Sequence, residues 1–384
     1  MAITIPKSSQ FDFDTLLFLI FFINIYILFF VEFSMDKISF LAGNEARALK
    51  FLKNISSKDK VAIVSHVDLD GIASAKVISK VVEHDFLKFV AYEQINEDLV
   101  KELKNNKITK IIMTDLSIDN IKIIKLIEKF ADILIIDHHL FDEDLNSSKT
   151  IFINSQEHCA SYLCYIIFSK VKNIKKLDWL VACACISDWK YFNNQDFMAD
   201  VMKKYGDKFE IVNNKTDFGG IRKSGKFWGL QLKLNLALIY FGYELIKAFN
   251  LLNDDIKNLN NLTKYADDVQ DEIDKSVEKF EKEKESFWDI YFWVFSEKFQ
   301  IKSIVATLAS VKYPNKTIII VKENQKYYSF SARRQDKKIN VVTLLKNAIS
   351  GLNGSFAGGH VAAGGGYILL KDLNKFKENL KKLS

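Results

Sequence analysis

Short apolar runs alternate with segments of helical periodicity through the first half of the chain. The apolar runs, which are rich in Ile, Val and Phe, lie at residues 61–64, 86–91, 111–113, 133–136 and 150–154. The segments between them repeat apolar residues every three to four positions, at residues 71–82, 97–104 and 119–130. Strands separated by segments of this length form parallel sheets with right-handed crossovers. The pattern therefore predicts an α/β domain built on a parallel sheet.

The second half of the chain has a different pattern. Residues 193–262 are mostly of helical type, and residues 267–285 are densely charged with little apolar content. The charged stretch predicts an exposed helix that joins two domains. Further apolar strand runs and a helix at 341–349 then lead to the glycine-rich segment 354–366. So many glycines predict a loop that turns tightly or approaches a ligand closely.

These patterns divide most of the chain into three parts. Residues 35–200 form the parallel-sheet domain, which starts with a helix predicted over residues 37–53. Residues 201–287 form a helical connector, and residues 288–384 form a smaller α/β domain. At 384 residues, with 48% hydrophobic and 27% charged residues, the chain can fill two cores and is not of the disordered class.

The first 34 residues stand apart because residues 15–31 are almost unbroken in apolarity. This length is at the low end of what spans a bilayer. A signal sequence fits poorly, since no basic cluster precedes the run and no small-residue cleavage site follows it. A membrane anchor and an upstream extension before a true start at Met35 remain as alternatives. As an anchor, the segment would leave the rest in the cytoplasm, because these basic residues follow it: Lys37, Arg47, Lys50 and Lys53.

Charge and cysteine content narrow the class of protein. The formal charge of +6 favours a polyanionic partner without requiring one. The four cysteines form no CxxC pair, so a zinc site or a disulfide scaffold is not expected. We expect them to be buried free thiols in a reducing cytoplasm. They are Cys159, Cys164, Cys183 and Cys185.

Acids and histidines follow three of the predicted strands. In chain order they are His66, Asp68, Asp70, Asp115, Asp137, His138 and His139. A single acid at such a position is commonly a helix N-cap. The carboxyl ends of parallel strands share one edge of the sheet, however, so three such strands would bring these residues together. Mixed carboxylate and imidazole ligands hold divalent ions that polarise a phosphoryl oxygen and activate water.

Five sequence motifs resemble those of a known family. SHVDLDG, MTDLS, IDHH and CISDW occur in the order of the four motifs of the DHH phosphoesterases. FAGGHVAAGG resembles the glycine-rich signature of the DHHA1 domain that often follows. The resemblance covers the chain from about Val61 to its C-terminus, with the middle unmatched. Archaeal RecJ-like exonucleases are the most similar subgroup, and nanoRNA and cyclic-dinucleotide phosphodiesterases share the same motifs.

The resemblance implies a role for each residue of these motifs. Two ions, Mn²⁺ or in its place Mg²⁺, would be held with Asp115 as the bridging ligand. Asp137 and His139 would be the catalytic pair. Asp137 would orient a metal-site imidazole, and His139 would face the scissile phosphate or the leaving oxygen. The sequence alone does not distinguish which of the adjacent histidines binds metal. The implied metal ligands are His66, Asp68, Asp70, Asp115, His138 and Asp188.

In the second domain the resemblance implies a phosphate-binding site. A guanidinium binds phosphate through two parallel hydrogen bonds, and a glycine loop can add backbone donors. Either Arg333 or its neighbour Arg334 offers the guanidinium. The implied substrate-binding residues are Ser331, Arg333, Gly358, Gly359, His360 and Gly364.

Together these features predict a two-domain, metal-dependent phosphodiesterase that hydrolyses single-stranded DNA or RNA from an end. Hydrolysis of short oligonucleotides or cyclic dinucleotides is the alternative within enzymes. A non-catalytic replication scaffold is the alternative from another class, but clustered buried carboxylates are costly without cations. Further expected partners are replication or repair proteins and, through residues 15–31, a membrane. Strand polarity and oligomeric state are not predicted.

Overall fold

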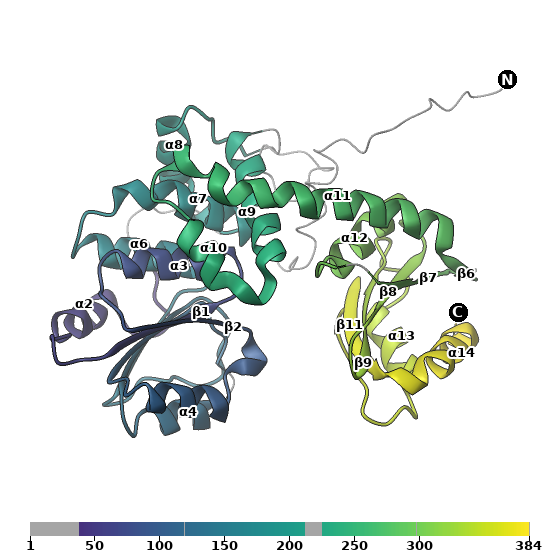
Figure 1. Ribbon diagram of the computed structural model, residues 1–384, viewed down its shortest axis with the longest axis horizontal. Helices are drawn as coiled ribbons and strands as arrows, with labels where there is room; N and C mark the ends of the chain where they lie inside the picture. The colour runs from purple at the N-terminus through teal and green to yellow at the C-terminus, as the bar shows by residue number, and fades with distance from the viewer. Residues whose placement is uncertain (1–37, 119, 212–224, 297, 384) are drawn as a thin grey trace. The chain divides into compact units, whose positions relative to one another are not determined.

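The computed structural model describes residues 38–118, 120–211, 225–296 and 298–383. The chain divides into two compact units, one ending at Ala266 and one comprising Asp267–Ser384 (Figure 1). The apolar segment 15–31 and Met35 lie outside the described residues. Within the described ranges, no helix is both long and apolar enough to cross a membrane.

A parallel five-stranded sheet forms the centre of the first unit. Its strand order is β2-β1-β3-β4-β5, and every neighbouring pair is parallel, which confirms the predicted sheet. Strand β1 therefore lies inside the sheet, between β2 and β3, with β4 next along. The strands are β1 (Val61–His66), β2 (Phe86–Val90), β3 (Lys110–Thr114), β4 (Asp132–Asp137) and β5 (Thr150–Asn154).

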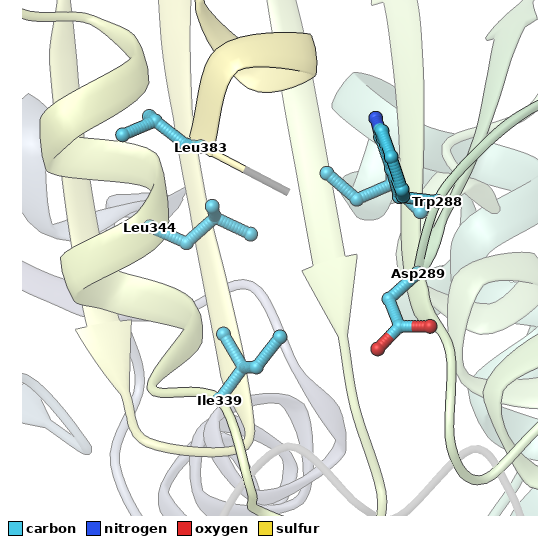
Figure 2. A pocket seen from close by; sticks show the side chains of 6 residues that line it. Trp288, Asp289, Ile339, Leu344 and Leu383 are labelled. Atoms are coloured by element: carbon cyan, nitrogen blue, oxygen red, sulfur yellow. The ribbon is translucent and has the colours of Figure 1, made fainter.

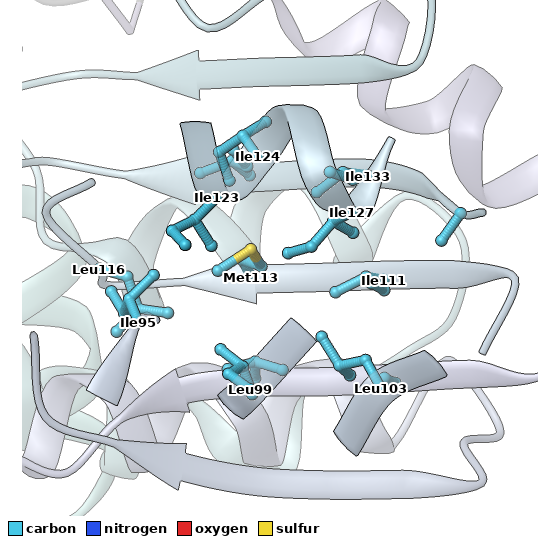
Figure 3. Close-up of a cluster of buried hydrophobic side chains, with 14 of the residues drawn as sticks. Ile95, Leu99, Leu103, Ile111, Met113, Leu116, Ile123, Ile124, Ile127 and Ile133 are labelled. Carbon is cyan, nitrogen blue, oxygen red and sulfur yellow. The ribbon is translucent and has the colours of Figure 1, made fainter. Parts of the chain in front are cut away.

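Helices cover both faces of this sheet (Figure 1). One face carries α4 and α5, whose leucines and isoleucines pack against Ile111 and Met113 of β3 (Figure 3). The other face carries α3, α6 and α7, which also pack against one another. Because both faces are covered, the strands are almost continuously apolar, as the sequence runs suggested. The helices are α3 (Leu69–Ser79), α4 (Glu97–Asn105), α5 (Ile121–Ile127), α6 (Ala160–Ser169) and α7 (Asp178–Ser187).

The helix predicted over residues 37–53 is shorter than expected. Helix α2 spans Glu45–Lys53 and starts at Asn44, whose side chain accepts a hydrogen bond from the Arg47 N–H. The described residues before it are not helical, and Ala42 forms a β-bridge with Asn154. The prediction was wrong at this end because contact with the sheet overrides the local helical spacing.

Further helices complete the first unit. They are α8 (Gln195–Lys204), α9 (Lys226–Phe241) and α10 (Leu245–Leu251). Helix α9 packs on α7 and buries Phe227, Trp228 and Leu232. The predicted connector, residues 201–287, thus includes α9 and α10 of this unit as well as α11 (Asn260–Glu283), most of which belongs to the second unit.

Helix α11 is not exposed on all sides, which corrects the prediction for residues 267–285. Val269, Ile273 and Phe280 are fully buried, and the Phe280 ring contacts the Trp293 ring at a centroid distance of 6.1 Å. These few apolar residues recur at helical spacing and form one narrow stripe. The high density of charge on the other sides obscured this stripe in the sequence.

The second unit is built on a mixed six-stranded sheet, ordered β10-β11-β9-β8-β7-β6. Only β7 and β8 pair in parallel. Helix α12 (Lys302–Lys312) packs on β8 and β9, while α13 (Val341–Ala348) and α14 (Leu373–Leu383) cover the opposite face. The strands are β6 (Glu285–Phe287), β7 (Ile290–Phe295), β8 (Thr317–Glu323), β9 (Tyr327–Arg333), β10 (Phe356–His360) and β11 (Ala363–Leu369).

The glycine-rich segment 354–366 is a β-hairpin instead of the predicted loop. Strands β10 and β11 pair antiparallel, with Gly358 opposite Gly365. The glycines serve close packing: a Cβ atom at Gly366 would lie 1.9 Å from the Phe356 carbonyl oxygen, and one at Gly364 would lie 2.7 Å from Leu345 Cδ1. The expected loop of free amides was therefore wrong, because the backbone here pairs in the sheet.

Candidate metal centre

Acidic and imidazole side chains from separate elements meet at the carboxyl edge of the first sheet. His66 ends β1, Asp137 ends β4, and Asp115 directly follows β3. Asp70 lies in the first turn of α3, and α7 ends at Asp188. Residues that are far apart in the sequence are therefore neighbours in space, as expected for the strand ends of a parallel sheet.

His138 is surrounded by three carboxylates. Its Nε2 atom lies 3.2 Å from Asp115 Oδ1, 3.2 Å from Asp188 Oδ2 and 3.9 Å from Asp70 Oδ2. One ligand atom from each of the four residues lies within 4.8 Å of the others. This group has the size and the atom types of a site for one divalent cation.

A second group of ligand atoms lies on the other side of Asp115. His66 Nδ1 is 2.9 Å from Asp68 Oδ2 and 3.6 Å from Asp115 Oδ2. Asp115 therefore belongs to both groups, with Oδ1 towards His138 and Oδ2 towards His66. It also forms a group of this kind with the two adjacent histidines, His138 and His139.

The backbone of Asp115 has a conformation that few side chains other than glycine adopt. Its φ is 58°, in the left-handed region, directly after the last residue of β3. Its N–H group donates to the carbonyl oxygen of Ile136 in the adjacent strand. Such a conformation costs of order 1 kcal/mol and persists where the surroundings enforce it, commonly at functional sites. Here it turns the carboxylate between the two groups.

Helix N-termini hold two of the other acids in place. Asp68 is the N-cap of α3, where its Oδ1 accepts a hydrogen bond of 3.0 Å from the Gly71 N–H. The Asp70 carboxylate accepts hydrogen bonds from the N–H groups of Ala160 (2.7 Å) and Ser161 (3.0 Å) in the first turn of α6. These partners orient the carboxylates and stabilise their negative charge.

The crowding of carboxylates disfavours their ionised forms. Burial raises the pKa of Asp115 well above its usual value, and the charges of Asp68 and Asp70 raise it further. Burial and the charge of Asp188 raise the pKa of Asp70 to about 6. Without a compensating positive charge, these acids cannot all be ionised near neutral pH.

The two histidines respond in the opposite sense. Burial lowers the pKa of His66, but the adjacent carboxylates of Asp115 and Asp68 outweigh it and raise the pKa to about 10. Burial also lowers the pKa of His138, and the hydrogen bond and charge of Asp188 raise it to about 9. Protons on the imidazoles thus supply the positive charge that a bound cation would otherwise supply.

The donor set fits a divalent cation on independent grounds. Asp115 Oδ2 is buried and accepts no hydrogen bond from the described residues. A buried carboxylate oxygen without a partner is costly unless something else, such as a metal ion, binds it. Several carboxylates with one or two imidazoles suit Mn²⁺ or Mg²⁺ better than zinc.

Asp137 and His139 form a pair beside this cluster. Asp137 Oδ1 is 2.8 Å from His139 Nδ1, and the Asp137 carboxylate also accepts a hydrogen bond from the His139 N–H. The histidine held by Asp137 is therefore His139, and His138 is the imidazole among the carboxylates. The hydrogen bond with His139 and the charges of both histidines outweigh burial and keep the Asp137 pKa below its usual value. An ionised Asp137 fixes the ring of His139 and leaves Nε2 pointing away.

Tyr92 is part of the site and was not predicted from the sequence. Its ring stacks on His66 at a centroid distance of 4.5 Å, and its hydroxyl lies 3.0 Å from His139 Nε2. Burial and the charge of Asp115 raise the pKa of Tyr92, so the phenol keeps its proton. Its position just beyond the end of β2, at the same sheet edge, is the signal that would have found it.

The predicted substrate-binding residues lie on three adjacent strands of the second unit. Arg333 on β9 is buried, and its Nη1 donates to Ser331 Oγ (3.2 Å) and to the carbonyl oxygens of Ala332 (2.8 Å) and Gly364 (3.4 Å). Strand β11 carries Gly364, and β10 beyond it carries Gly358, Gly359 and His360. The alternative guanidinium, Arg334, is already engaged by the Asp336 carboxylate, at 2.7 and 3.2 Å.

A hollow of about 410 Å³ on the second unit is separate from these residues (Figure 2). Its lining is mainly apolar, and Leu344 and Ile290 belong to the core beneath α13 and α14. It therefore opens on the sheet face opposite to Ser331 and Arg333. The lining residues are Trp288, Asp289, Ile290, Ile339, Leu344 and Leu383.

Family models match both units. The model of the DHH family N-terminal domain matches residues 60–186, and the model of the DHHA1 domain matches residues 291–383. The first match includes most of the acidic cluster, and the second includes β7 to β11. A comparison with curated proteins gives no match.

Solved structures share the fold at low sequence identity. A manganese-bound exonuclease RecJ aligns with a TM-score of 0.65 and 14% identity, over 89% of this chain and 94% of that chain. RecJ from Thermus thermophilus, in complex with Mn²⁺, aligns with a TM-score of 0.61 and 14% identity, over 90% of this chain and 55% of that chain. CDC45 from Entamoeba histolytica aligns with a TM-score of 0.56 and 10% identity, over 88% of this chain and 98% of that chain. The fold is therefore that of the DHH phosphoesterases.

Proposed function

Because the chain carries a DHH family N-terminal domain followed by a DHHA1 domain, and so belongs to the DHH family, we propose that it is a metal-dependent phosphodiesterase. Its proposed substrate is single-stranded nucleic acid, degraded from an end. The observation that carries this proposal is the pair of ligand groups that share the buried carboxylate of Asp115. Two carboxylate-rich sites with one shared ligand suit the in-line displacement at a phosphodiester.

In this proposal His66, Asp68 and Asp115 would hold one divalent ion, and Asp115 with three further residues would hold a second. Such ions would polarise the phosphoryl oxygens as Lewis acids and lower the pKa of the attacking water. The protein's own residues fix the ligand positions through the α3 and α6 N-termini and exclude water through burial. The three further ligands are Asp70, His138 and Asp188.

The pair of Asp137 and His139 supplies a proton-transfer group in this proposal. Asp137 holds the Nδ1 side of the ring, so the Nε2 atom next to the Tyr92 hydroxyl faces outward. A ring held in this way can donate a proton to the leaving oxygen or hydrogen-bond the phosphate. Tyr92, which stays neutral, is a second donor at the same position.

The scaffold alternative shares the fold, as the similarity to CDC45 shows. What favours an enzyme is that all six predicted ligands lie together in this chain. A scaffold needs no such cluster, and crowded buried carboxylates destabilise a fold that binds no cation.

One assay separates the candidate functions. End-labelled single strands of DNA and RNA of several lengths, a duplex and cyclic di-AMP are incubated with the protein and Mn²⁺, with Asp115→Asn as the control. We expect stepwise release of mononucleotides from long single strands, slower reaction on duplex, and no reaction by the control. Cleavage confined to oligomers of a few nucleotides, or preferential opening of the cyclic substrate, would replace this function with the corresponding alternative. Absence of any hydrolysis would favour the scaffold.

A further inference from the structure

Three exposed aromatic rings form a row across the second sheet. Tyr327 on β9, Tyr367 on β11 and Phe356 on β10 are 42%, 42% and 56% exposed. The Tyr327 and Tyr367 ring centroids are 5.6 Å apart, and those of Tyr367 and Phe356 are 6.1 Å apart with an interplanar angle of 29°. We call Tyr327, Tyr367 and Phe356 the aromatic row.

The row lies on the face of the sheet that also carries Ser331 and Arg333. Side chains alternate along β9, so Tyr327 shares a face with these two residues, and Phe330 points into the core on the other face. Tyr367 is paired with Ser329 of β9 and with Phe356 of β10, which places all three rings on this face. On this side of the sheet α12 packs on β8 and β9, and Phe280 of α11 contacts Trp293 of β7.

Beside the aromatic row, strands β10 and β11 carry glycines. Gly358 and Gly365 are paired opposite each other on β10 and β11, next to the Phe356 and Tyr367 pair. A Cβ atom at Gly358 would lie 3.1 Å from Phe356 Cζ, so the Phe356 ring covers this glycine. Gly365, paired with Ser331 of β9, leaves β11 backbone without a side chain that a flat molecule can approach closely.

Two cationic side chains lie on the same face of the sheet as the row. Lys302 of α12 donates to Ser329 Oγ at 2.8 Å, and Arg333 Nε is buried with no hydrogen-bond acceptor among the described residues. Within the described residues, neither of these two forms an ion pair. Burial is the main cause that lowers the pKa of Lys302 to about 8, and the charges of Lys322 and Arg333 lower it further. An anion bound beside Lys302 would favour its charged form.

We propose that the aromatic row is a stacking platform for successive bases of a single nucleic-acid strand, with Lys302 and Arg333 beside its phosphates. Exposed rings on a sheet next to cations are the arrangement by which proteins bind unpaired bases, because every base has a stacking face. A row of three rings has room for two or three bases, so it fits a strand better than a single nucleotide. This inference rests on the proposed function and narrows its substrate to a strand with accessible bases.

Binding measured without turnover tests the platform. Full-length protein with Asp115→Asn, which blocks hydrolysis, is titrated against a fluorescein-labelled single strand and against an abasic strand of the same length. We expect Tyr367→Ala to weaken binding of the normal strand about tenfold, and Tyr327→Ala with Phe356→Ala together to weaken it about 100-fold. The combined Tyr327→Phe and Tyr367→Phe variant keeps the rings and should bind within about twofold of the parent. Tyr243→Ala, which removes a ring that is 96% exposed in the first unit, is the matched control.

The abasic strand keeps the phosphates and removes the bases, so the parent should bind it more weakly, and Tyr367→Ala should cause no further loss. This comparison on the parent protein stands even where an alanine variant does not fold. Equal affinity of the parent for both strands, or unchanged affinity in Tyr367→Ala, would overturn the platform. If the rings prove necessary for binding but the wild-type protein hydrolyses none of the substrates, the proposed function is contradicted and the platform is not.

Discussion

Asp115 is the residue on which the proposed chemistry depends most. Its strained backbone and its burial place one carboxylate between two histidines, with Oδ1 3.2 Å from His138 Nε2 and Oδ2 3.6 Å from His66 Nδ1. The sequence predicted this position because an acid directly after a buried strand must lie at the sheet edge. The strain and the direction of each oxygen were not predictable, since they arise from contacts with neighbouring strands.

The pKa shifts of the cluster lead to a prediction for metal binding. Folding raises the pKa of Asp70, His66 and His138, so their protonated forms stabilise the metal-free protein at low pH. This stabilisation is lost as the pH rises through about 6 for Asp70 and about 9 to 10 for the histidines. A bound cation must displace these protons, so Mn²⁺ affinity should rise with pH.

Thermal melts with and without Mn²⁺ between about pH 5.5 and about pH 8.5 check this prediction, because a tighter ligand raises the melting temperature further. The increase caused by Mn²⁺ should grow with pH in the wild type and be absent in Asp115→Asn. An increase that is constant, or that shrinks as the pH rises, would mean that these groups are not the ligands.

Tyr92→Phe should lower kcat roughly three- to tenfold with little change in KM, as expected for the loss of one hydrogen bond at the reacting groups. The variant keeps the ring that stacks on His66 and removes only the hydroxyl beside His139. Steady-state kinetics on a single-stranded substrate measure both parameters, with Tyr243→Phe as the control. Unchanged kcat would assign Tyr92 to packing alone. Tyr92 belongs to no motif, and its position just after the predicted strand 86–91 was the one sequence signal for it.

Among the elements, the turn from β1 into α3 positions two of the three residues in the ligand group of His66, Asp68 and Asp115. Strand, N-cap and first helical turn follow one another within a few residues, so His66, Asp68 and Asp70 are fixed by one short segment. Gly71 allows this turn, since a Cβ atom there would lie 2.4 Å from the His66 carbonyl oxygen.

Gly71→Ala should therefore destabilise the protein by about 2 kcal/mol or more and remove Mn²⁺-dependent activity, because backbone must shift to admit the methyl group. Gly229→Ala in helix α9 is the matched control, because a Cβ atom there meets none of the described residues within 4 Å outside the helix's own backbone. The control should be stabilised by about 0.5–1 kcal/mol through helix propensity. Urea unfolding of both variants gives the two free energies, and equal effects would show that the β1–α3 turn tolerates a side chain.

Elements with strong periodicity were predicted well, and those shaped by tertiary contact were not. The parallel strands and the helices between them follow from apolar runs that alternate with helical spacing. Glycine content did not distinguish a loop from the β10–β11 hairpin, because close strand packing and tight turning both require glycine. The buried stripe of α11 was not predicted, because its few apolar residues lie among many charged residues.

At the scale of the whole molecule, the two units carry separable tasks in this account. The first unit contains every proposed metal ligand, and the second contains the aromatic row and the predicted phosphate-binding residues. The structure places Ser331, Arg333 and His360 on neighbouring strands of this unit, and their roles in binding phosphate are predictions.

A chain that begins at Met35 should be as active as the full-length protein. Every proposed ligand lies well beyond residues 15–31, and the first sheet is complete from β1 onward. Specific activity of the two forms, with the longer one in detergent, is the measurement. A large loss in the shorter form would mean that the first 34 residues contribute to the active fold.

In the proposed enzyme, one cluster of acids and histidines forms two metal sites joined by Asp115. The direct test is an anomalous difference map from crystals soaked in Mn²⁺. We predict two peaks on either side of the Asp115 carboxylate, one next to His66 and Asp68, the other enclosed by Asp70, His138 and Asp188. No peak within this cluster, or a single peak that the Asp115 carboxylate does not contact, would contradict the account.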